Sequence, residues 1–173
     1  MAVSCDPEKE FKTEISEIDQ HLAEIDSLEN ILDGIDFDSL KLMVEHVKRN
    51  EAEIKRMYTP DTLNEEFGRQ MNDCKAIRKN LGNIGKDQSL YGDELNAIKH
   101  QLIDLQTDVK NGVLNKEQLT EYLAVEKAAL DKVSLSFGTF YAMVSAERYR
   151  YQVVVPKVDE FIEGLKMTND QLD

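Results

Sequence analysis

Residues 119–165 read LTEYLAVEKAALDKVSLSFGTFYAMVSAERYRYQVVVPKVDEFIEGL, and this stretch decides the fold class. Counting alternately four and three residues from Leu119 gives an apolar side chain at every step except Glu126 and Glu147. The positions are Leu119, Leu123, Glu126, Leu130, Val133, Phe137, Phe140, Val144, Glu147, Tyr151, Val154, Val158, Phe161 and Leu165. A period of 3.5 residues places one stripe on one side of a helix, and that stripe leaves water only against partner helices. The stretch therefore predicts a long helix in a bundle.

The same count describes residues 63–109, where only Gln70 and Gln88 are polar. The register continues through the glycines of the segment Gly82–Gly85. We therefore expect one long helix here, with a break or bend near those glycines.

Apolar residues between Phe11 and Tyr58 also follow a helical period, but in two sets displaced from each other by one residue. The displacement falls at residues 33–36, Asp-Gly-Ile-Asp, where Gly34 predicts a break. Asp38 is the expected N-cap of the resumed helix.

Turn and capping residues divide the chain into three helical arms. The expected arms are 7–58, 60–110 and 115–166, preceded by an N-terminal segment 1–6 and followed by a C-terminal tail 167–173. Pro60 suits a first helical position, and Asn115 with Gln118 can form a capping box. Short connections make successive helices antiparallel neighbours. The sequence predicts an all-α fold, an elongated antiparallel three-helix bundle or coiled coil with arms of about 50 residues, each roughly 75 Å long.

The composition excludes some classes of partner. The chain has 34 acidic and 21 basic residues, a formal net charge of −13. Binding to nucleic acid needs clustered Lys and Arg, so we expect no nucleic-acid partner. No run approaches the roughly 18 apolar residues of a membrane-spanning helix. Cys5 and Cys74 are far apart in the sequence and give no disulfide framework.

No pattern of reactive or metal-binding residues is present in the sequence. His21, His46 and His100 lack the spacing of metal ligands, and we interpret them as surface or boundary residues. Cys74 lies on an apolar stripe and is interpreted as a buried thiol. We therefore expect no catalytic residues, no metal ligands, no cofactor and no enzymatic activity.

The segment from Tyr149 to Pro156 is irregular for a helix. It contains Val153, Val154 and Val155 in succession, and proline removes a backbone donor. A kinked bundle helix is one interpretation. The other is a groove for a small ligand that opens at the kink, with Tyr149 and Arg150 on its rim.

The N-terminus carries Ser4-Cys5 followed at once by the acidic segment Asp6–Glu10. This arrangement resembles the processed end of Bacteroidetes-type bacterial lipoproteins. The resemblance implies that Cys5 is the acylated residue, that Asp6–Glu10 is a sorting segment, and that the protein is at the outer membrane, facing the periplasm or the exterior. The alternative is an ordinary cytoplasmic N-terminus with a reduced Cys5.

These features lead to three functional expectations. The first is a non-enzymatic, lipid-anchored spacer or docking element of a bacterial cell envelope that binds a protein partner. The apolar pair Met57 and Tyr58, beside a turn, is its candidate contact surface, unless these side chains close the end of the core. The second is an intracellular coiled-coil adaptor without a lipid. The third is a helical bundle that binds a small ligand.

Overall fold

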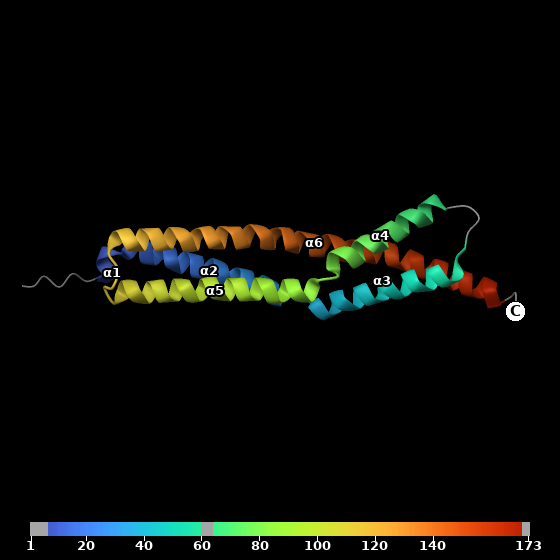
Figure 1. Ribbon diagram of the computed structural model, residues 1–173, viewed down its shortest axis with the longest axis horizontal. Coiled ribbons are helices and arrows are strands. Elements are labelled where there is room, and N and C mark those ends of the chain that lie inside the picture. The colour runs from blue at the N-terminus through green and yellow to red at the C-terminus, as the bar shows by residue number, and fades with distance from the viewer. Residues whose placement is uncertain (1–6, 60–63, 171–173) are drawn as a thin grey trace, which may run out of the picture. The chain divides into compact units, whose positions relative to one another are not determined.

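The computed structural model describes residues 7–59 and 64–170, with side chains at 9–59 and 64–168. Within these ranges the chain forms six α-helices and no strand, which confirms the all-α helical bundle (Figure 1). The helices are α1 (Pro7–Glu10), α2 (Lys12–Asp33), α3 (Phe37–Met57), α4 (Glu65–Leu81), α5 (Ile84–Lys110) and α6 (Lys116–Asp170). No helix in the described ranges has the length and apolar character needed to cross a membrane.

The helices are grouped into two compact units. Unit 1 comprises Met1–Ile35 and Gln88–Gly138, and unit 2 comprises Asp36–Asp87 and Thr139–Asp173. Each unit contains three main helical segments, and α6 contributes one segment to each.

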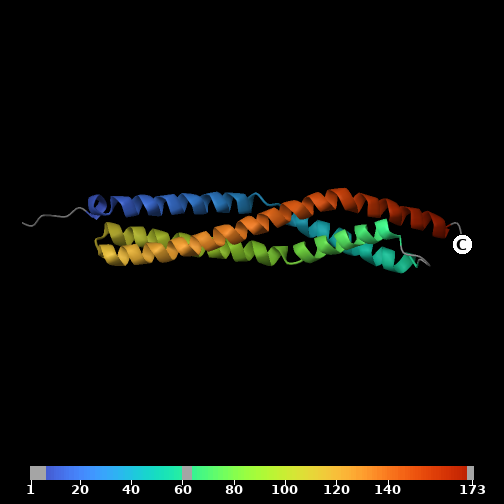
Figure 2. The ribbon, with the colours of Figure 1, turned by 90° about the horizontal axis from the view of Figure 1, so that it is seen from above.

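Unit 1 packs α2 and α5 in opposite directions, with the first part of α6 beside them (Figure 2). Lys99 of α5 reaches Asp26 and Glu29 of α2 at 2.7 and 2.6 Å. Further along, Gln106 donates to Asp19 at 2.6 Å, so a later residue of α5 meets an earlier residue of α2. The buried core includes Ile18, Ile25, Leu95, Leu102, Val109, Leu119, Leu130 and Phe137.

Unit 2 packs α3, α4 and the second part of α6. Arg78 of α4 meets Glu51 of α3 at 2.7 Å, and Asn80 of α4 meets Glu147 of α6 at 2.7 Å. Its core residues include Leu40, Val44, Val47, Cys74, Ile77, Leu81, Val144, Val155 and Val158. The expected stripe is shifted near its end, because Ile162 is buried while Phe161 is half-buried.

The break at Gly34 is confirmed, but its capping residue differs from the expectation. Asp36 has a non-helical backbone, with φ −76° and ψ 83°, and its side chain accepts a hydrogen bond from the Ser39 amide at 2.9 Å. Asp38 already lies in the first turn of α3 and pairs with Lys41. The helix therefore begins earlier than the spacing suggested, and the expectation for Asp38 was wrong.

The break near Gly82 is also confirmed, although a single bent helix was the wrong expectation. Gly82 and Asn83 separate α4 from α5. A Cβ atom on Gly82 would lie 2.7 Å from the Arg78 carbonyl oxygen, so a side chain does not fit there without a shift. At the start of α6 the expected capping box is present: the Gln118 amide donates to the Asn115 side chain at 2.9 Å, and the Asn115 amide to the Gln118 side chain at 3.2 Å.

Helix α6 contains 55 residues and continues through Pro156 without interruption. Proline cannot donate to the carbonyl of Gln152, four residues earlier. The buried neighbours Val154, Val155 and Val158 offset this loss by packing in the core of unit 2. The helix ends at Asp170, beyond residue 166 where the third arm was expected to end.

Candidate docking site

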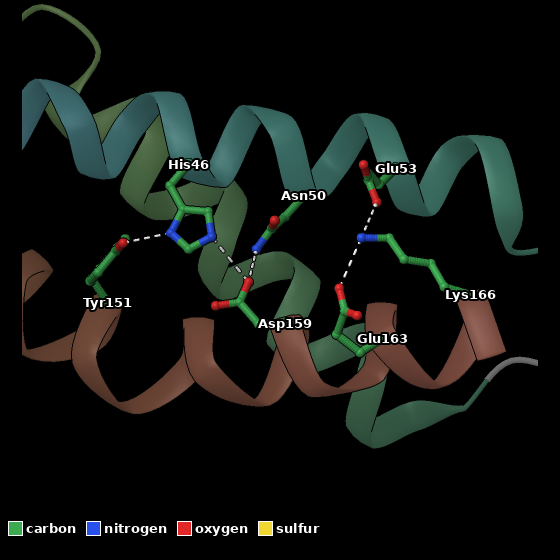
Figure 3. A network of polar contacts seen from close by, with 7 residues as sticks. All are labelled: His46, Asn50, Glu53, Tyr151, Asp159, Glu163 and Lys166. Atoms are coloured by element: carbon green, nitrogen blue, oxygen red, sulfur yellow. Dashed lines mark hydrogen bonds and ion pairs between the residues drawn. The ribbon is translucent and has the colours of Figure 1, made fainter.

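A polar network joins α3 to α6 within unit 2 (Figure 3). His46 of α3 lies between two residues of α6, with its Nδ1 2.7 Å from the Tyr151 hydroxyl and its Nε2 3.1 Å from Asp159 Oδ1. The buried Asn50 donates to the same Asp159 oxygen at 2.5 Å. Lys166 similarly lies between Glu53 of α3 and Glu163 of α6, at 3.2 and 2.9 Å.

The geometry of this network is consistent with one assignment of its hydrogen bonds. A neutral His46 ring with its proton on Nε2 donates to Asp159 and accepts the Tyr151 hydroxyl proton on Nδ1. Burial, and then the Asp159 carboxylate, raise the pKa of Tyr151. These contacts join residues of α3 to residues of α6, and we interpret the network as a structural link between the two helices.

Arg150 belongs to a second polar cluster, between α4 and α6. The Glu147 side chain is buried, with 3% of the residue exposed, and its Oε1 accepts from Asn80 and from the Arg150 guanidinium. Arg150 Nε also lies 3.4 Å from Asp73. The hydrogen bond to Glu147 raises the pKa of Arg150. Arg150 therefore holds a buried carboxylate and also reaches the surface, since about a third of its side chain is exposed.

Tyr149 points to solvent, with 69% of the residue exposed. It lies in an exposed face of α6 that carries no charge: the exposed residues between 139 and 156 are Thr139, Tyr141, Ala142, Ser145, Ala146, Tyr149, Gln152, Val153 and Pro156. On α3, in the same unit, the exposed residues are Asp38, Lys41, Leu42, Glu45, Lys48, Arg49, Ala52, Lys55 and Arg56, and seven of these nine are charged. We call the set Ala142, Ala146, Tyr149, Val153 and Pro156 the α6 outer stripe.

Met57 and Tyr58 lie where α3 ends, and both are half-buried. The Tyr58 ring meets Phe67 and Phe161 edge to face, with ring centroids 5.3 and 5.1 Å away. The Tyr58 ring therefore packs as expected for a residue that closes one end of the core. That Met57 and Tyr58 contact a partner stays a prediction. Beside this cluster is an open groove of about 710 Å³, lined by residues of α4 and α6 that include Phe67 and Phe161.

Several other residues singled out in the sequence have defined positions. Cys74 is fully buried, as expected. His21 is buried, with 8% exposed, which corrects its interpretation as a surface or boundary residue: it lies on the face of α2 that also buries Ile18 and Ile25. The proposed acylation site Cys5 lies outside the described residues. Among the residues described, no group of three or more His, Cys, Asp or Glu side chains is placed to hold a metal ion.

Sequence reasoning identified Tyr149 because it precedes an irregular segment, but it did not find the network around His46. Tyr149 and Arg150 do not line the groove of about 710 Å³, which is formed farther along α6. Comparisons with protein-family models, curated proteins and solved structures found no match to this chain. The function is therefore argued from the chain's own residues.

Proposed function

We propose that this protein is a non-enzymatic docking element of a bacterial cell envelope, held at the membrane by a lipid on Cys5. The observation that supports docking most strongly is the uncharged exposed face of α6 around Tyr149. A chain in which 32% of residues are charged has many charged side chains available for an exposed helix face. None of the nine exposed residues between 139 and 156 is charged, because Glu147 is buried and Arg148 and Arg150 are half-buried. An exposed face without charge is expected if a partner covers it.

Tyr149 has the properties of a residue that anchors a protein interface. Tyrosine offers a large contact area at a small cost in conformational entropy, and it is enriched among residues that dominate binding energy. The exposed Val153 and Ala146 lie beside it on the same face, so the contact would be continuous and apolar. The exposed residues of α3, which are mainly charged, lack this character.

Docking is tested by replacing Tyr149 with a photo-crosslinking amino acid in the cells that make the protein. We expect crosslinks to one or a few defined protein partners. Leu42 of α3 is the matched control, because it is also 69% exposed in unit 2. Crosslinks that are absent from Tyr149, or equally strong from Leu42, would contradict docking at this face.

The anchor is supported by the resemblance of Ser4-Cys5 and the following acidic segment to processed lipoproteins. Metabolic labelling with a clickable palmitate analogue tests it on the natural gene product, with Cys5→Ser as the control. We expect label on the natural protein and none on the variant. An unlabelled natural protein in the soluble fraction would favour the alternative, an intracellular adaptor that uses the same helical surface without a lipid.

The groove beside Phe67 and Phe161 supports a second candidate, a bundle that binds a small ligand. Its volume of about 710 Å³ is within the range of small-molecule sites. Mass spectrometry of the purified protein, first native and then denaturing, tests this candidate. A bound small molecule that is released on denaturation, and lost in a Phe161→Glu variant, would support it.

A further inference from the structure

The α6 outer stripe has a period of its own. Its members, Ala142, Ala146, Tyr149, Val153 and Pro156, are separated by four, three, four and three residues, and all are exposed. The buried stripe of the same helix has the same period but uses other positions. Packing within unit 2 needs only the buried stripe. A second apolar stripe at 3.5-residue spacing is the pattern that a helix presents to another helix along its length.

The sizes of these side chains suit such a partner. Ala142 and Ala146 are small and allow another backbone to approach closely. Tyr149 is large and central, and Val153 follows it on the same stripe. Alternating small and large residues let facing helices interdigitate.

One edge of the outer stripe is basic. In a heptad whose core positions are those of the stripe, Arg150 and Lys157 lie on one flank, and Ser145, Gln152 and Asp159 lie on the other. Asp159 is already bound to His46 and Asn50. Arg150 forms ion pairs with Glu147 and Asp73. Lys157 is exposed and forms no ion pair with any residue that the structure describes. An edge with two basic residues is unusual in a chain with a net charge of −13.

We propose that the α6 outer stripe binds an amphipathic helix of a partner protein whose acidic side chains face Arg150 and Lys157. This inference rests on the proposed docking function and specifies the chemistry of the partner. Flanking charges set partner choice in paired helices. An acidic flank on the partner gives opposite charges along this edge, while its apolar stripe covers Tyr149.

A second copy of this chain fits the stripe less well. Antiparallel pairing would put Arg150 and Lys157 of one copy against the same residues of the other, which places like charges together. Parallel pairing would put them against Ser145 and Gln152, which carry no negative charge. Neither arrangement supplies the acids that the basic edge would attract.

The inference is tested with two synthetic helical peptides of about four heptads that share a Leu-rich stripe. One peptide carries Glu at the flanking positions and the other carries Lys. Fluorescence anisotropy with the full chain measures both affinities. We expect the Glu peptide to bind at least tenfold more tightly, and this preference to shrink at high salt because exposed charges are screened. The net charge of the protein alone would favour the Lys peptide, so the local edge and the overall charge predict opposite results.

Two variants and a matched control locate the binding surface. Tyr149→Glu should weaken binding of the Glu peptide at least tenfold, whereas Leu42→Glu, at an equally exposed site, should leave it unchanged. Lys157→Glu should reduce the preference for the Glu peptide over the Lys peptide. Circular dichroism of each variant confirms that the fold is kept.

Three outcomes would overturn the inference. They are equal or tighter binding of the Lys peptide, no binding of either peptide, and a dimer in sedimentation equilibrium that Tyr149→Glu dissociates. Photo-crosslinking from Tyr149 distinguishes rejection of the acidic helical partner from rejection of docking itself. If Tyr149 crosslinks to a partner in cells but neither peptide binds, the docking function stands and only the acidic helix is rejected.

Discussion

Raising the pH above 9 should destabilise this protein through Cys74. The thiol is fully buried, and burial, followed by the carboxylates of Glu51 and Asp73, raises its pKa from 9.0 to about 11. In the unfolded chain the thiol is exposed and ionises near 9.0. The unfolded state therefore releases its proton at lower pH than the folded state. The contribution to stability is complete below pH 9 and is lost as the pH rises from 9 to about 11.

The size of this effect follows from the two pKa values. At pH 10 the unfolded thiol is mostly ionised and the folded thiol mostly protonated, which lowers the free energy of unfolding by about 1 kcal/mol relative to pH 7. Above pH 11 the loss approaches a limit of about 3 kcal/mol.

Chemical denaturation at pH 7 and pH 10 measures this loss. The experiment uses a Cys5→Ser background and compares Cys74 with Cys74→Ala, so that the titration of Tyr and Lys residues cancels. The chain with Cys74 should lose about 1 kcal/mol more than the variant between the two pH values. A thiol reagent should also label Cys74 slowly in the folded protein and rapidly in denaturant. An identical pH dependence in the two chains, or rapid labelling of the folded protein, would refute the reasoning.

Three further predictions concern the stability of the helices. Leu102 is fully buried, so Leu102→Ala should lower the free energy of unfolding by about 2–5 kcal/mol, whereas Ile103→Ala, at a site 42% exposed, should cost less than about 1 kcal/mol in the same denaturation experiment. Gly138→Ala in α6 should stabilise the protein by about 0.5–1 kcal/mol and raise the thermal midpoint, because a Cβ atom there meets nothing within 4 Å. Gly82→Ala should lower the thermal midpoint, because its Cβ atom would lie 2.7 Å from a carbonyl oxygen. Asp159→Asn should cost about 1 kcal/mol in urea denaturation, since it weakens the acceptor shared by a histidine and an asparagine, and no loss would mean that the network is not formed in solution.

The helices and their buried faces could be predicted because their signals are local. Phe137, Val144 and Val158 follow a 3.5-residue period that is visible in the sequence, and all three are buried. Gly34 and Gly82 mark the breaks because glycine and its polar neighbours favour turns. The precise helix start was harder to place: both Asp36 and Asp38 are suitable caps, and backbone geometry selects Asp36.

The polar links could not be predicted in the same way. His46 and Tyr151 are 105 residues apart, and their contact depends on how α3 and α6 are aligned lengthwise. A heptad repeat allows several such alignments, each displaced by seven residues, and the apolar pattern alone does not choose among them. The burial of Asn50 could not be predicted for the same reason, since the side chain that accepts its hydrogen bond, Asp159, is 109 residues away. Tyr149 was identified for its position near Pro156, but the uncharged face around it becomes visible only when exposure is known for each residue.

The distribution of α6 between the two units has a consequence for how the chain is made. In unit 1, Ser134 reaches back 110 residues to Glu24, and in unit 2, Asp159 reaches back 109 residues to Asn50. At a synthesis rate of about 5–20 residues per second, α2 and α3 each wait roughly 5 to 20 s for their contacts with α6. The parts of these helices that α6 covers stay open to water or to chaperones during that time.

Unit 1 needs α6 as far as Gly138, and unit 2 needs the part of α6 that begins at Thr139. Each core is therefore completed only after translation has reached α6. A message cut short before residue 139 would yield a chain in which unit 2 has α3 and α4 but no part of α6. Because α6 is translated after α2, α3, α4 and α5, both units depend on it to complete their cores.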